Sequence, residues 1–192
     1  KAGPAGPWLA KDVETKATRI ERMLNFLVQT DKLWDRQALL ERARSVFLNV
    51  LLARESGTVK ADELFPATAE ALRAEIARRQ QDGASIEYRN LCVRKVELIH
   101  VFNQADNRND EFTVRISAHA QRIITKQGAV VGRDEDVTPF TQYWVFGRLD
   151  GTWKLKEVLP EAAGEARLGA ENVDEGTSAD QLQWYYRQTR AT

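Results

Sequence analysis

The residues best suited to acid–base chemistry in this sequence are His100 and Glu157. His100 lies in an alternating stretch and shares a face with Val96, Leu98 and Phe102, so its imidazole would sit on an apolar surface. A histidine there could act as a general base inside a pocket. The same pattern also suits a core histidine whose hydrogen bonds are satisfied, which is the commoner case.

Glu157 is the second candidate, because it shares one face of a predicted strand with Trp153 and Leu155. A half-buried carboxylate in that setting could be a pocket acid. It could equally form a cross-strand ion pair with Arg148 on the neighbouring strand. The sequence leaves both interpretations open.

The sequence lacks the motifs of metal binding, nucleophilic catalysis and phosphate binding. His119 lies on an alternating polar face, and neither histidine has the His-x-x-x-His spacing of a zinc site. The single cysteine, Cys92, excludes an internal disulfide and a cysteine-based zinc site. Gly-x-Ser-x-Gly and glycine-rich phosphate loops are absent from the sequence. We therefore predict no catalytic residue, no metal and no cofactor.

The composition narrows the class of partner. The chain has 192 residues with 28 basic and 28 acidic side chains, so its net charge is zero and nucleic acid is not an expected ligand. No stretch approaches the ~20 apolar residues that span a bilayer. The sequence begins with Lys1 rather than Met, so we expect a preceding segment that could carry a membrane anchor.

Three helices are predicted in the first half of the chain. Apolar spacing indicates helices over residues 13–28, capped by Asp12, and over residues 36–55, capped by Asp35. A third helical region covers residues 61–81 and is divided at Pro66.

After these helices the apolar residues recur at every second position, which is typical of strands. Residues 86–104 and 111–127 read as long strands, and residues 139–159 as an aromatic hairpin around Asp150-Gly151. Without βαβ alternation, this order predicts an α+β fold, with three N-terminal helices packed on a curved, mainly antiparallel four-stranded sheet.

Two tails complete the expected organisation. Residues 1–10 are a predicted linker, residues 11–160 the domain, and residues 161–177 a second, flexible linker. Residues 178–192 are expected to form a short helix with an aromatic cluster of Leu182, Trp184, Tyr185 and Tyr186. That cluster would dock on its own domain or on a partner.

The first helix and its approach are basic. Basic side chains beside an interfacial tryptophan suit contact with anionic lipid, although a solvated helix packed on its own domain has the same pattern. The residues concerned are Trp8, Lys11, Lys16, Arg19 and Arg22.

The order of these elements resembles the Tim44-like domain family. The resemblance rests on Phe47 in the second helix, Leu64-Phe-Pro-Ala after it, and the strand at residues 93–101. It is strongest at Phe140-Thr-Gln-Tyr-Trp-Val-Phe-Gly-Arg, followed by Gly151-Thr-Trp-Lys-Leu. Family members have a similar Phe-Thr-Glu-x-Trp-x-Phe-x-Arg strand, so Gln142 departs from the pattern.

The resemblance implies a cone-shaped fold like that of nuclear transport factor two. It further implies a non-enzymatic, membrane-proximal scaffolding domain of a bacterial inner membrane, contacting anionic phospholipid such as cardiolipin or a membrane protein complex. Two alternatives are a cone-fold enzyme of the isomerase or dehydratase kind and a homodimerising module. In each case we expect an apolar pocket in the sheet, lined by His100, Phe102, Tyr143, Trp144, Phe146, Trp153 and Glu157.

Overall fold

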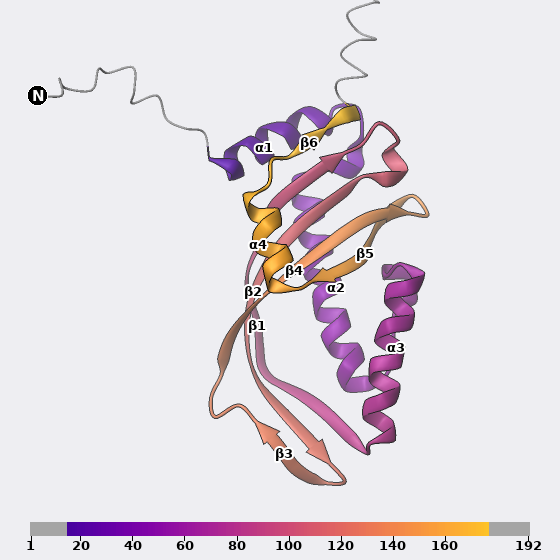
Figure 1. Cartoon of the computed structure of the whole chain (residues 1–192), viewed down its shortest axis with the longest axis vertical. Helices are drawn as coiled ribbons and strands as arrows, with labels where there is room; N and C mark the ends of the chain where they lie inside the picture. Colours follow the sequence, from indigo (N-terminus) through magenta and orange to yellow (C-terminus); the bar gives the residue numbers. More distant parts are fainter. Residues whose placement is uncertain (1–14, 177–192) are drawn as a thin grey trace, which may run out of the picture.

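The computed structural model describes residues 15–176, in which the helices of the first half of the chain cover one face of a long, curved sheet (Figure 1). In chain order the elements are α1 (Lys16–Leu27), α2 (Arg36–Ser56), α3 (Pro66–Gln81), β1 (Ala84–Asn103), β2 (Glu111–Lys126), β3 (Ala129–Arg133), β4 (Thr138–Leu149), β5 (Thr152–Leu159), α4 (Glu161–Gly169) and β6 (Val173–Asp174). Single 3-10 turns, η2 (Lys32–Trp34), η3 (Ala61–Glu63) and η4 (Asn107–Asn109), join some of them. The predicted α+β class and curved antiparallel sheet are confirmed.

Local signals fix the helix ends. Asp35 accepts a hydrogen bond from the Ala38 amide at 3.0 Å and begins α2, and Gly57, with a left-handed φ of 82°, ends it. Pro66 occupies the first turn of α3, as predicted. The N-terminal cap of α1 is Thr15, while the predicted cap Asp12 lies outside the described residues.

The sheet has six strands rather than the predicted four. Its order is β5-β4-β2-β1-β6, and β3 pairs with the far end of β2. Strand β3 was not among the predicted strands; positive φ angles at Gln127 and Gly128 fold it back on β2 as a hairpin. The short β6 runs parallel to β1, a long-range pairing that periodicity does not reveal.

An aromatic core fills the space between the helices and the concave face of the sheet. The ring of Phe47 on α2 meets Trp144 edge-on at 5.1 Å between centroids. Phe112 on β2 stacks on Phe146 of β4 at 5.0 Å. The hairpin aromatics that dominate the sequence therefore hold α2 against the sheet.

The predicted linker over residues 161–177 is wrong, since α4 and β6 form there. Helix α4 packs against β1, β4 and β5. A Cβ atom at Gly164 would overlap the ring of Tyr143, so the missing side chain lets helix and strand approach closely. The Tyr143 hydroxyl also donates to Glu165 at 3.0 Å. Small residues looked like linker composition, but they are what this contact requires.

Two further predictions concern segments outside the described residues. The linker at residues 1–10 and the aromatic helix at residues 178–192 both lie outside residues 15–176. Within residues 15–176, no helix is long and apolar enough to cross a bilayer.

Replacing Gly164 tests the contact between α4 and β4. We expect Gly164→Ala to lower the free energy of unfolding by about 1–3 kcal/mol, because the new methyl group must displace Tyr143 or the helix. Gly169→Ala is the matched control in the same helix, since no atom lies within 4 Å of a Cβ there. Chemical denaturation of both variants measures the difference, and equal stabilities would contradict the packing argument.

Candidate functional site

The guanidinium of Arg148, near the end of β4, joins several segments at one end of the sheet. It forms ion pairs with Asp31, in the turn between α1 and α2, and with Asp110 at 2.8 Å. Its Cζ lies 5.4 Å from the ring centroid of Trp34 and 4.9 Å from that of Trp153. The charge is thus held between two aromatic rings and two carboxylates.

Asp110 is the most perturbed acid in this cluster. Its side chain is 0 % exposed, and burial raises its pKa to about 6. The amide of Gln104, which donates at 2.7 Å, and the charge of Arg148 oppose that rise, while Asp31 adds to it. The Gln104 amide and the charge of Arg148 together keep the raised pKa of this buried carboxyl from rising further.

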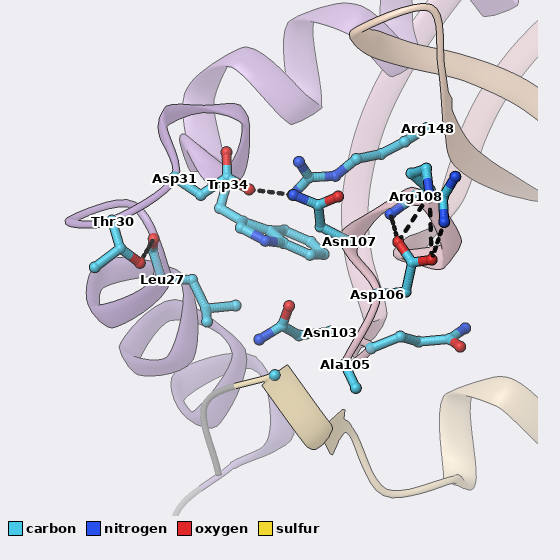
Figure 2. Close-up of a pocket in the computed structure, with 12 residues that line it drawn as sticks. Leu27, Thr30, Asp31, Trp34, Asn103, Ala105, Asp106, Asn107, Arg108 and Arg148 are labelled. Atoms are coloured by element: carbon cyan, nitrogen blue, oxygen red, sulfur yellow. Dashed lines mark hydrogen bonds and ion pairs between the residues drawn. The ribbon is translucent and has the colours of Figure 1, made fainter. Parts of the chain in front are cut away.

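An open hollow of about 860 Å³ lies beside this cluster, and we call it the loop hollow. Figure 2 shows Leu27, Trp34 and Arg148 on one side and the chain after β1 on the other. The lining residues are Leu27, Thr30, Asp31, Trp34, Asn103, Gln104, Ala105, Asp106, Asn107, Arg108, Arg148 and Gly176. Asp106 is held by Arg108, with a shortest contact of 2.8 Å. The two partly exposed carboxylates of the loop hollow, Asp31 and Asp106, are each paired with an arginine.

A second, shallower depression of about 440 Å³ runs along α1, and we call it the α1 groove. Its α1 wall consists of Arg19, Arg22, Met23 and Phe26, at spacings that place them on one helix face. The opposite wall is Glu171, Asn172 and Asp174, from the segment between α4 and β6. Phe26 is 49 % exposed, which is unusual for a phenylalanine on a packed helix.

Lys16 has a structural role. Its Nζ donates to the carbonyls of Arg167 at 2.8 Å and Leu168 at 3.0 Å, at the C-terminal end of α4. Burial lowers the pKa of Lys16, although the charge of Glu171 opposes this. A cation at that end of a helix satisfies carbonyls that lack intrahelical donors. This part of the predicted basic face therefore ties α1 to α4.

The comparisons with known proteins match this architecture. A model of the Tim44-like domain matches residues 21–159. The chain belongs to the Tim44-like domain family. The search of curated proteins finds no significant match.

One solved structure supports the fold of this Tim44-like domain. The crystal structure of the intermembrane space region of the chloroplast protein ARC6 aligns with a TM-score of 0.52 and 16% identity, covering 66% of this chain and 98% of that one. At that identity the likeness shows the fold alone. A designed β-sheet protein, solved by NMR, aligns at 15% identity over 64% of this chain and 87% of its own, with a TM-score of 0.35.

The motif residues of the Tim44-like domain lie in its core. Trp144, Phe146 and Trp153 are buried, and the Trp153 indole donates to the Leu33 carbonyl at 2.6 Å. A Cβ atom at Gly147 would lie 2.9 Å from the ring of Phe65, so the Phe-Gly-Arg sequence makes room for the Leu64-Phe-Pro-Ala segment. None of the seven residues predicted to line a pocket lines either depression described above.

His100 is buried against the C-terminal segment. Its Nε2 lies 3.0 Å from the carbonyl of Glu171, and its Nδ1 is buried without a partner. Burial lowers its pKa, the Glu171 carbonyl opposes this, and the charges of Lys16 and Arg167 lower it further. Beside it Phe102 is half-buried and pairs with Val173 of β6.

Glu157 is exposed and does not meet His100 or Arg148. A bulge between Val145 and Phe146 shifts the β4–β5 register, so Glu157 pairs with Val145 and turns away from Trp153 and Leu155. His100 and Glu157 are three strands apart, which corresponds to about 14 Å between their backbones. These two residues therefore form no acid–base pair. The predicted ion pair of Glu157 with Arg148 is also absent, because Arg148 pairs with Asp110 and Asp31.

The sequence analysis named Arg19 and Arg22 of the α1 groove, but it missed Phe26 beside them and the carboxylates Asp31 and Asp110 around Arg148. Neither carboxylate carried a motif, because each is recognisable only by its long-range pairing with Arg148. The one signal in the sequence was Arg148, near the end of the aromatic strand. If this arginine is buried, its charge requires carboxylate partners.

Asp110 gives the stability a pH dependence of its own. Because its pKa is raised by folding, its favourable contribution is present below about pH 4 and is lost as pH rises through about 6. We expect the stability of Asp110→Asn relative to the parent to rise by roughly 3 kcal/mol between pH 4 and pH 7, whatever the offset from losing the Arg148 ion pair. Urea denaturation at several pH values measures the difference, and a difference independent of pH would contradict a raised pKa.

His100 predicts the opposite trend. Its pKa is lowered by folding, so its contribution is present above about pH 6.5 and is lost as pH falls through the folded pKa. We expect the stability advantage of the parent over His100→Gln to shrink at acidic pH, because protonation places a buried N–H without a partner. NMR titration of the His100 imidazole should show it staying neutral below the ordinary pKa of histidine, and an ordinary titration would contradict the argument.

Proposed function

We propose that this Tim44-like domain is a non-enzymatic, membrane-proximal binding domain that docks on anionic phospholipid through the α1 groove. The observation that carries the proposal is the exposed Phe26, which lies with Met23 on the same face of α1 as Arg19 and Arg22. A cationic helix face with an exposed aromatic side chain is suited to the headgroup region of a bilayer. A scaffolding role at a bacterial inner membrane rests on the family resemblance.

The charges lining the α1 groove determine how much of the lipid-binding energy is ionic and how much comes from apolar insertion. Glu171 and Asp174 face Arg19 and Arg22 across the groove, so the local positive charge is small. Each arginine near an anionic surface contributes about 1 kcal/mol. Insertion of Phe26 and Met23 must therefore supply a large share of the binding energy, with the arginines giving selectivity for anionic lipid. Trp8 and Lys11, outside the described residues, would extend this surface along the chain.

The alternatives have weaker support. An enzyme would need His100 or Glu157 in a cavity, but His100 is covered by the C-terminal segment and Glu157 faces solvent. An apolar ligand would need a pocket where the core aromatics are packed against each other. A homodimer remains an alternative through the exposed Val130 and Val131 of β3.

Vesicle co-sedimentation tests the lipid proposal. We expect the parent domain to bind vesicles containing cardiolipin at low salt and to bind neutral vesicles much more weakly. The double variant Arg19→Gln, Arg22→Gln should bind cardiolipin vesicles about ten- to thirtyfold more weakly, since it loses about 2 kcal/mol of electrostatic attraction.

The matched control is Arg73→Gln, Arg78→Gln, which removes the same charge from exposed positions on α3. Phe26→Ser should weaken binding while preserving the preference for anionic vesicles. Equal loss in the α1 and α3 variants would mean that net charge alone drives binding. Failure of the parent to bind either vesicle would leave a membrane protein as the partner class and overturn the lipid proposal.

A further inference from the structure

The C-terminal chain enters the loop hollow at Gly176, the last described residue, which forms part of its wall. We propose that residues 178–190 of the same chain fill this hollow, placing Trp184, Tyr185 and Tyr186 against its lining. The occupant is thus a segment of the protein itself. This docking is independent of lipid binding at the α1 groove.

The direction of the chain supports this occupant. Strand β6 runs parallel to the end of β1, with Val173 opposite Phe102 and Asp174 opposite Asn103. The Asn103 amide donates to the Asp174 carboxylate at 2.9 Å, which fastens the two strands. Because β1 continues directly into the loop at residues 104–108, a parallel chain leaving β6 starts out beside that loop.

Gly176 brings the backbone against this loop. A Cβ atom there would lie 2.9 Å from both the Gln104 carbonyl oxygen and the Asn103 amide nitrogen. Only a residue without a side chain fits so close to β1. The residues that follow therefore begin at the wall of the hollow.

The lining suits aromatic side chains with polar tips. Leu27 and Trp34 provide apolar surface, while Thr30, Asn103 and Asn107 provide hydroxyl and amide groups. The carboxylates Asp31 and Asp106 are already paired with Arg148 and Arg108, so the walls offer no unbalanced charge to recruit an ion. Tyrosine and tryptophan combine an apolar body with a hydrogen-bonding group, and both types occur at positions 184–186.

Reach and local concentration favour the chain's own segment over a free ligand. Trp184 is eight residues beyond Gly176, which spans about 12 Å as a helix and up to about 28 Å when extended. A short tether gives an effective concentration in the millimolar range, so weak contacts suffice for docking.

Paramagnetic relaxation in the full-length chain tests the proposal. With Cys92→Ser as background, a nitroxide at Asn107→Cys should remove at least half of the amide signal intensity of residues 182–187. A nitroxide at Asp82→Cys, an exposed polar position at the other end of the molecule, is the control and should leave these signals unchanged (Figure 1). Trp184→Ser with Tyr185→Ser should abolish the loss caused by the label at position 107.

The outcomes separate the occupants. Equal signal from both labels, or an effect that survives the double serine substitution, would overturn the proposal. A mixture of isotope-labelled chain without nitroxide and unlabelled chain with nitroxide detects docking between copies. Signal loss in that mixture would assign the hollow to a second molecule and would also overturn docking within one chain. The measurements use no lipid, so failure of the vesicle experiment does not affect them.

Discussion

The pairing of Arg148 with a fully buried carboxylate constrains much of this fold. Burying a guanidinium is costly unless its charge is paired, and here Asp110 and Asp31 form ion pairs with it while the rings of Trp34 and Trp153 lie against it. Those partners come from the α1–α2 turn, the end of η4 and strand β5. Trp153 lies opposite Arg148 in the same hairpin, but Asp31, Trp34 and Asp110 are distant in the sequence. The ion pairs therefore form only when the hairpin, the helices and the loop after β1 are all in place.

The aromatic motif of the family fills the core of this domain. Phe47, Trp144, Phe112 and Phe146 fill the concave face at ring distances of about 5 Å, which leaves no space for a ligand among them. Gly147 lacks a side chain, so the ring of Phe65 can pack directly against β4. Surface depressions therefore form at the margins of this core, beside α1 and beside the loop after β1.

Sequence reasoning located the elements whose ends depend on nearby residues. Asp35, Gly57, Pro66 and Asp150-Gly151 each act within a turn, so their meaning is readable without the fold. The failures involve long-range geometry. A bulge between Val145 and Phe146 turned Glu157 outward, and Gly164 became a helix contact through Tyr143, a residue on another element. A one-residue shift in register moves every later side chain of the strand to the opposite face of the sheet, and the local sequence pattern does not predict such a shift.

The C-terminal segment at residues 161–176 then carries much of what is particular to this chain. It lies beyond the family match at residues 21–159, yet it supplies one wall of the α1 groove and part of the loop hollow. Lys16 and His100 both hold it through backbone carbonyls, so its position depends on the packing of α1 and β1. A family domain specifies the core, whereas partner choice depends on the surfaces added to it. Related domains with a different C-terminal segment would thus keep the Arg148 cluster and present different grooves.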